Sequence, residues 1–265
     1  MIRLLKIEFY KIIYNKSFWI ILGLYVLFFM PIAYGIDNFF SSFSVGTERQ
    51  TYLDVNSSKS SIFNFPFVWH NLAYLAGWFK LLLAIIIVIL VTSEYSYKTL
   101  KQNIIDGMSK WEVIWAKELV ILILSFIAVL FLVIVILVAG KSPDEVSFFK
   151  GSSVLLIYFL SLVVYLNFTY FLSLWLKKSG LVLGILFLYT LVIENVLTYK
   201  LPESISRYFI INLIDRLIPN PLLKIVGHDT HIDFSIPSLL VCFFYIAFFI
   251  LLNHWLLKKG HVGKD

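Results

Sequence analysis

The sequence predicts an all-α membrane protein with six transmembrane helices, an N-terminal interfacial helix and both termini in the cytoplasm. Composition, the length of the apolar runs and the distribution of basic residues predict it. Hydrophobic residues make up 60% of the 265-residue chain and charged residues only 14%, and the mean hydropathy is +0.88. A soluble domain of this length needs much more polar surface. The chain is therefore predicted to form a single membrane domain over residues 1–265.

Six apolar runs, each 19 to 23 residues long, are long enough to cross a bilayer. A helix rises about 1.5 Å per residue and needs about 20 residues to cross a hydrocarbon core of about 30 Å. The predicted spans are 17–35, 72–92, 119–139, 154–176, 181–199 and 237–257. None of these runs shows the alternation of apolar and polar residues that barrel strands require. Helices are therefore predicted for all six.

The distribution of lysine and arginine predicts the orientation. With the N-terminus in the cytoplasm, the inside segments carry 13 of these residues and the longer outside segments carry 8. Cytoplasmic segments of membrane proteins are enriched in Lys and Arg, so both termini are predicted inside. The net charge of +6 is explained by this bias, and no nucleic-acid partner is expected.

Residues 1–16 form a pattern of their own before the first span. Apolar side chains such as Phe9 and Ile12 fall on one face of a helix, and Glu8, Lys11 and Asn15 fall on the opposite face. A basic amphipathic helix at this place is predicted to lie in the inner membrane interface. A cleaved signal peptide is the alternative, but the apolar run is long for one, so a retained first span is expected.

The longest outside segments are residues 36–71 and 200–236. In the second, the spacing of apolar residues from Ile205 to Leu217 predicts a short helix in the outer interface, ended by Pro219 and Pro221. No internal repeat separates a second domain.

Catalytic, metal-binding and cofactor-binding patterns are incomplete throughout the chain. Gly140-Lys141-Ser142 resembles the end of a phosphate-binding loop, but the required earlier glycine is absent, because position 135 is Val. His228, His231 and Asp233 have spacing that suits zinc, but the Glu base and third His of a metalloprotease are missing. Cys242, the single cysteine, excludes an intrachain disulfide. No enzyme activity and no cofactor are predicted.

The polar segment 93–118 separates two of the most apolar runs. Tyr97, Leu100 and Ile104 fall on one face of a predicted helix over 96–106, and Gly107 suits the left-handed position just past its end. Ser109 and Glu112 then have the spacing of a capping box, which begins the next helix. The segment is therefore predicted to be ordered, although a plain interfacial linker is the simpler alternative.

This segment resembles the region between spans two and three of ABC-2 type transporter permeases. Such permeases have a Glu after span two, a Thr-Leu pair, a Gly or Pro followed by Ser and a basic residue, and a Lys that opens span three. The matching positions here are Glu94, Thr99-Leu100, Gly107-Met108-Ser109-Lys110 and Lys117. The layout of six spans and an amphipathic N-terminal helix is also similar. In length the chain is similar to permeases of bacitracin and lantibiotic self-protection exporters and of sodium-efflux systems.

The resemblance implies a function and partners. The helix after span two would be a coupling helix, docked on a separate ABC ATP-binding subunit that hydrolyses ATP. A second permease copy, identical or related, would complete the exporter in the cytoplasmic membrane of a bacterium. The residues implied in contact with the ATPase are Glu94, Tyr97, Thr99, Leu100, Lys101, Ile104 and Gly107. The substrate is not predicted.

Two charges within predicted spans are Lys80 and Glu194. Both are expected in the outer half of the bilayer, where an unpaired charge is costly, so they are candidates for an intramembrane ion pair. The alternative is that each side chain reaches the outer surface separately. Two other functions stay open: a membrane anchor or assembly factor that transports nothing, and an ATP-independent carrier.

Overall fold

A computed structural model describes residues 2–45, 65–140, 151–218 and 236–259 of the chain. Within these ranges every regular element is a helix. The first half contains α1 (Ile2–Ile13), α2 (Lys16–Val45), α3 (Phe67–Trp78), α4 (Lys80–Ser96), α5 (Thr99–Ile105) and α6 (Lys110–Ala139). The second half contains α7 (Val154–Leu176), α8 (Ser179–Leu188), the π-helix η1 (Tyr189–Ile193), α9 (Glu194–Lys200), α10 (Glu203–Ser206), α11 (Ile210–Leu217) and α13 (Ile236–Lys259). The prediction of an all-helical fold is confirmed for the described residues.

Several of these helices are long and apolar enough to cross a membrane. Among the described residues four qualify: α6, α7, the continuous segment Ser179–Lys200 and Pro237–Lys259. A fifth is formed if α3 and α4 are taken as one bent span, and α2 contributes the shorter apolar stretch Lys16–Pro31. The protein is therefore a multi-pass membrane protein.

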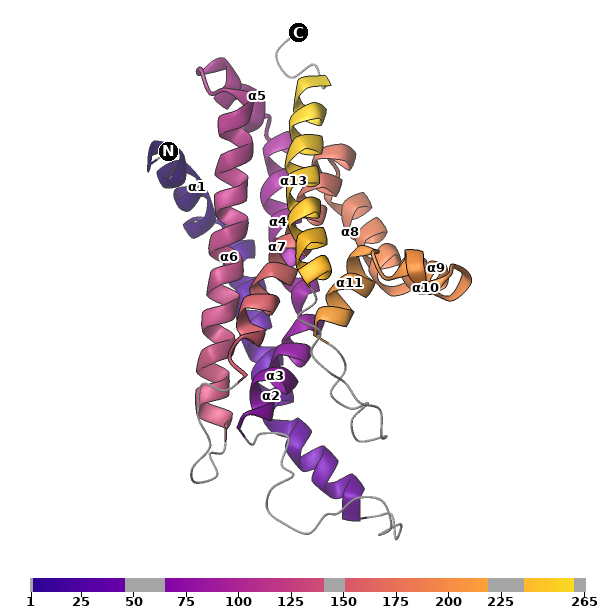
Figure 1. Ribbon diagram of the computed structural model, residues 1–265. Helices are drawn as coiled ribbons and strands as arrows, with labels where there is room; N and C mark the ends of the chain where they lie inside the picture. The colour runs from indigo at the N-terminus through magenta and orange to yellow at the C-terminus, as the bar shows by residue number, and fades with distance from the viewer. Residues whose placement is uncertain (1, 46–64, 141–150, 219–235, 260–265) are drawn as a thin grey trace.

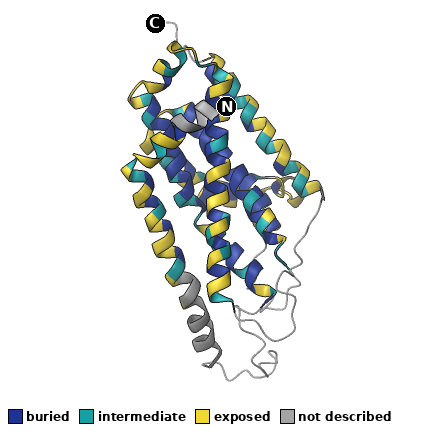
Figure 2. Ribbon diagram, turned by 90° about the vertical axis from the view of Figure 1, so that its left-hand side faces the viewer, coloured by how far each residue is buried: buried dark blue, intermediate teal, exposed yellow. Residues whose placement is uncertain are grey.

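Helix α7 forms the centre of the bundle. It contacts α3, α4, α6, α8, α11 and α13. The most apolar 18-residue stretch of α7 is 78% buried inside the protein, compared with 17% for the corresponding stretches of the segment Ser179–Lys200 and of α13. Figure 2 shows the same contrast between buried inner helices and helices whose outer faces are exposed. The peripheral helices thus present apolar surface outward, as expected for contact with lipid or another membrane-embedded chain.

One end of the bundle collects three separate parts of the chain. Helices α1 and α5 lie there together with the last turns of α13 (Figure 1). Helix α6 begins at this end and runs the length of the bundle (Figure 1). We refer to it as the α5 end.

The second predicted span, 72–92, is interrupted in the structure. The structure divides it at Phe79 into α3 and α4, whose axes differ by 43°. The ring of Phe79 packs edge-on against Tyr25 and Phe29 of α2, with centroids 6.1 and 5.3 Å apart. These ring contacts hold the chain at the break, and Lys80 becomes the first residue of α4.

The caps predicted for the polar segment are confirmed. The Ser109 side chain accepts a hydrogen bond from the backbone N–H of Glu112, and the Glu112 carboxylate accepts one from the backbone N–H of Ser109. Gly107 has a φ of +96° directly after α5. Residues without a Cβ adopt this left-handed backbone at no steric cost. The two caps separate α5 from α6 as two ordered helices.

Gly107→Ala is expected to lower the free energy of unfolding by about 1 kcal/mol, because a Cβ is strained in the left-handed region. No neighbouring atom lies within 4 Å of that Cβ, so the cost is one of backbone conformation alone. Gly23→Ala in α2 is the matched control, since its Cβ also meets nothing within 4 Å but its backbone is helical. Thermal unfolding in detergent should show a lower Tm for the first variant and an unchanged or higher Tm for the second. Equal Tm values would contradict the explanation.

Candidate functional site

An ion-pair cluster of four residues joins three helices at the α5 end. Lys117 of α6 places Nζ 2.5 Å from Glu8 Oε2 of α1 and 2.6 Å from Glu94 Oε1 of α4. Lys11 of α1 places Nζ 2.8 Å from Glu8 Oε1 and 2.7 Å from the same Glu94 oxygen. Each ammonium therefore contacts both carboxylates. Because Glu94 lies near the end of α4 and Lys117 two turns into α6, the cluster fixes both spans to α1.

The cluster is buried, and its charges balance. Glu8, Glu94 and Lys117 are each no more than 5% exposed, and only the Lys11 side chain reaches the surface. Burial alone would raise the pKa of the Glu8 carboxyl, but the nearby Lys117 and Lys11 ammonium groups hold it below its usual range. A buried ion pair is costly to break, because the partner that remains is a desolvated and uncompensated charge. The four residues therefore act as one unit.

Helix α1 is oriented differently from the sequence-based expectation. Glu8 and Lys11 were assigned to a polar face opposite the apolar one, at the membrane interface. The structure turns these two charges into the bundle, and leaves Phe9 (56% exposed) and Tyr14 (79% exposed) on the outside. The charges point inward because α4 and α6 supply their counter-charges. The exposed aromatic side is then suited to contact with a membrane interface.

Helix α5 follows the cluster directly. Between Ser96 and Thr99 the chain turns through Lys98, which adopts a left-handed conformation with φ of 57°. The turn places α5 beside α4, with which it is in contact. Any displacement of α5 must therefore move the end of α4 and, through the ion-pair cluster, α1 and α6.

The residues predicted to contact an ATPase divide into two groups. Glu94 and Leu100 are buried within the chain, at 4% and 3% exposure, and Ile104 is half-buried against the same core. Lys101 is also half-buried, whereas Tyr97, Thr99 and Gly107 are exposed. The expectation that Leu100 lies on a contact surface is wrong for this chain, because its side chain packs inward.

The exposed surface at α5 contains two of the predicted residues, Tyr97 and Thr99, and one residue that was not predicted. Tyr97 is 80% exposed, and Ile105, which the sequence pattern did not single out, is 65% exposed. Ile105 was missed because its neighbour Ile104 fits the helical spacing of the buried face. We define the α5 surface as Tyr97, Thr99 and Ile105. An exposed aromatic side chain such as Tyr97 is a typical anchor of a protein contact, and Ile105 adds exposed apolar area to this surface.

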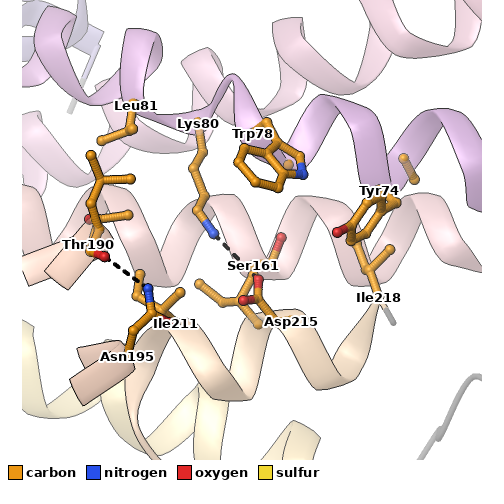
Figure 3. A pocket seen from close by; sticks show the side chains of 14 residues that line it. Tyr74, Trp78, Lys80, Leu81, Ser161, Thr190, Asn195, Ile211, Asp215 and Ile218 are labelled. Atoms are coloured by element: carbon orange, nitrogen blue, oxygen red, sulfur yellow. Dashed lines mark hydrogen bonds and ion pairs between the residues drawn. The ribbon is translucent and has the colours of Figure 1, made fainter. Parts of the chain in front are cut away.

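The structure gives Lys80 a different carboxylate from the predicted one. Lys80 Nζ lies 3.8 Å from Asp215 Oδ1 of α11 (Figure 3). Glu194 Oε1 accepts a hydrogen bond of 2.7 Å from the backbone N–H of Asn212 instead. Asp215 was overlooked because its segment was assigned to the outer interface and not to the interior next to span two.

The incomplete chemical motifs lie mostly beyond what the structure describes. His228, His231 and Asp233, together with Lys141 and Ser142, are outside the described residues. Within the described ranges no three His, Cys, Asp or Glu side chains gather as metal ligands. Cys242 is buried in α13.

Comparison with known proteins gives one match. Residues 28–262 match the model of a family described as Protein of unknown function (DUF2705). No curated protein matches the chain. The match covers α3 to α13 and most of α2. It begins after α1 and therefore does not include Glu8 and Lys11 of the ion-pair cluster.

Lys117→Met is expected to lower stability by about 3–5 kcal/mol, because it leaves Glu8 and Glu94 buried with one ammonium between them. Lys178→Met is the matched control, since Lys178 is exposed at the turn between α7 and α8. Thermal unfolding in detergent measures both variants. Adding Glu94→Gln to Lys117→Met should recover part of the loss, because one uncompensated charge is removed. A Tm for Lys117→Met equal to that of the control would show that the cluster does not stabilise the fold.

The same cluster predicts a pH dependence. The pKa of Glu8 is lowered in the folded chain. A lowered pKa stabilises the fold above the unfolded-state pKa, and this contribution is lost as the pH falls through the folded-state pKa. The Tm of the wild type should therefore fall more steeply than that of Glu8→Gln when the pH is lowered from about 5 to 3. Parallel curves would indicate that Glu8 does not contribute.

Proposed function

The chain belongs to the DUF2705 family of proteins of unknown function, and we propose that it is the membrane-spanning permease subunit of an ATP-driven exporter of the ABC-2 type. ATP is hydrolysed by a separate subunit, and this chain carries no catalytic site of its own. In this proposal six helices cross the cytoplasmic membrane of a bacterium. Both termini and the α5 end face the cytoplasm.

The observation that supports the proposal most strongly is the coupling of α5 to the bundle. The short helix α5, which carries the exposed Ile105 and is preceded by the exposed Tyr97, lies between two longer helices, α4 and α6. Those two helices are tied to each other and to α1 by buried ion pairs. A plain interfacial linker needs neither of these features. A partner docked on the α5 surface has a rigid route to the interior of the bundle.

The mechanism follows from this rigidity. When two ATP-binding subunits close, the docked α5 helices are displaced with them. Because the cluster prevents α4, α6 and α1 from separating, they move as one body and not one by one. Tilting of this body relative to the rest of the bundle opens a path toward the outside. ATP binding is thereby converted into movement of the substrate.

The partners in this proposal are an ATP-binding subunit, a second permease copy and the lipid bilayer. The exposed apolar faces of the segment Ser179–Lys200 and of α13 provide surface for both lipid and a second copy. If the protein were only a membrane anchor, the ion-pair cluster would stabilise the fold but would have no role in transmitting movement.

One observation favours an ATP-independent carrier as the second candidate function. Such carriers place charges and interrupted helices inside the membrane. The break between α3 and α4 puts Lys80 at a helix start, opposite Asp215. Uptake or efflux by membrane vesicles that contain this chain alone, without ATP or an ATPase, would support the carrier and contradict the exporter.

Substitution of the α5 surface tests the docking. The double variant Tyr97→Asp, Ile105→Asp is expected to reduce co-purification of the ATP-binding subunit at least about tenfold, because carboxylates replace apolar anchors. Tyr199→Asp is the matched control, since Tyr199 is 92% exposed on α9, away from α5. Leu100→Asp is unsuitable, because it would place a carboxylate in the core of the chain itself.

The readout is the amount of ATP-binding subunit that is recovered with each tagged and correctly inserted variant. The purified permease alone should hydrolyse no ATP. Recovery of the ATPase with the double variant at the control level would overturn the docking assignment. ATP hydrolysis by the purified chain alone would contradict the proposal that a separate subunit hydrolyses ATP.

A further inference from the structure

A second site lies in the other half of the bundle from the ion-pair cluster. A partly open cavity of about 220 Å³ is lined by residues at the break between α3 and α4, by α7, by η1 with α9, and by residues of α11 and directly after it. Lys80 lies 14 residues before Glu94, or about 21 Å along α4 at 1.5 Å per residue. The cavity is therefore separate from the α5 end, and neither the cluster nor the docking surface uses its residues.

Lys80 supplies a cation to this cavity. Its side chain is 10% exposed, and Nζ lies 5.4 Å from the centre of the Tyr165 ring. The 3.8 Å between Nζ and Asp215 Oδ1 exceeds the roughly 2.7–2.9 Å of a charge-assisted hydrogen bond. The ammonium is largely withdrawn from water and only loosely paired. It is thus placed to bind an anionic oxygen that enters the cavity.

Asp215 and two aromatic rings form the opposite part of the site. The Asp215 side chain remains 62% exposed although it faces Lys80. Figure 3 shows Lys80 and Asp215 pointing toward each other, with the rings of Trp78 and Tyr74 from α3 along the same cavity. Trp78 is 67% exposed. A carboxylate and an exposed aromatic ring in one cavity attract an ammonium group through charge and cation–π contact.

From these two halves we infer that the cavity binds a zwitterionic headgroup, with its phosphate on Lys80 and its ammonium between Asp215 and Trp78. A simple anion would meet the negative charge of Asp215, and a simple cation would meet Lys80. A ligand with both charges satisfies both side chains at once. The volume suits a headgroup and not a whole lipid molecule.

The surroundings of the cavity indicate how the rest of an amphiphile is accommodated. Leu191 lines the cavity and is 55% exposed, and Leu188 and Val192 beside it are 54% and 49% exposed. These side chains belong to a peripheral segment whose apolar surface faces outward. An acyl chain attached to the headgroup can therefore lie along α8 and η1 in the membrane. The source of the headgroup is accordingly a phospholipid or lysophospholipid.

The experiment titrates the detergent-purified full-length chain with lysophosphatidylethanolamine and counts bound molecules by native mass spectrometry. Lysophosphatidylglycerol is the anionic comparison, and free phosphoethanolamine is the competitor without a chain. Lys80→Met and Asp215→Asn each remove one charge of the site. Lys98→Met removes an exposed lysine near α5 and is the control. Gel filtration confirms that each variant is folded.

Removal of either charge is expected to weaken lysophosphatidylethanolamine binding by at least about tenfold, whereas Lys98→Met leaves it unchanged. Asp215→Asn should improve lysophosphatidylglycerol binding relative to the wild type, because a repulsive carboxylate is lost. Unchanged binding of the zwitterionic lipid in both site variants would overturn the assignment, as would equal binding of the two lipids by the wild type. If free phosphoethanolamine displaces the lipid at a concentration equal to that of the lipid, the acyl chain does not contribute to binding, and the assignment of the ligand as a lipid is overturned.

The binding assay needs no ATPase and no transport. Its failure therefore leaves the docking experiment on the α5 surface unaffected, and failure of docking leaves the lipid site unaffected.

Discussion

The arrangement at the α5 end depends on one interaction, the burial of two carboxylates between two ammonium groups. Glu8, Lys11, Glu94 and Lys117 come from three helices; Glu8 and Lys11 pair within α1, and the other contacts join α1 to α4 and α6 and join α4 to α6. The membrane makes this constraint strict, since charges withdrawn from water must be matched. The direction of α1, the spacing of α4 and α6 and the position of α5 all follow from this matching.

Much of the fold was predictable from local pattern. The long apolar runs, the capping box at Ser109 and the glycine after α5 are signals within a few residues of the feature they specify. The structure adds what local pattern does not contain. Glu8 looks like a surface residue on a helical wheel, and it becomes buried only because Lys117 lies more than a hundred residues later in the chain. Leu100 and Ile105 are two apolar residues of one short helix, and either could have been the buried one. Only the position of the core determines that Leu100 is buried and Ile105 is exposed.

The break at Phe79 shows the same limit in the apolar part of the chain. Hydropathy over residues 72–92 is continuous, and no proline marks the bend. The cause is tertiary, because the Phe79 ring is held by Tyr25 and Phe29 of another helix. The pairing of Lys80 with Asp215 could not be predicted for a related reason, since it requires α11 to pack against α7 rather than lie on the surface.

The order in which the cluster residues are synthesised has a consequence for biogenesis. Lys117 is the last of the four to leave the ribosome, and until then Glu8, Lys11 and Glu94 together carry one excess negative charge. The N-terminal helix therefore has no neutral binding site in the nascent chain before the third long apolar helix begins to enter the membrane. Its docking is a late event, completed only when residues from both ends of the first half of the chain meet. A nascent chain that stalls before residue 117 would keep its first helix without the counter-charge that completes the cluster.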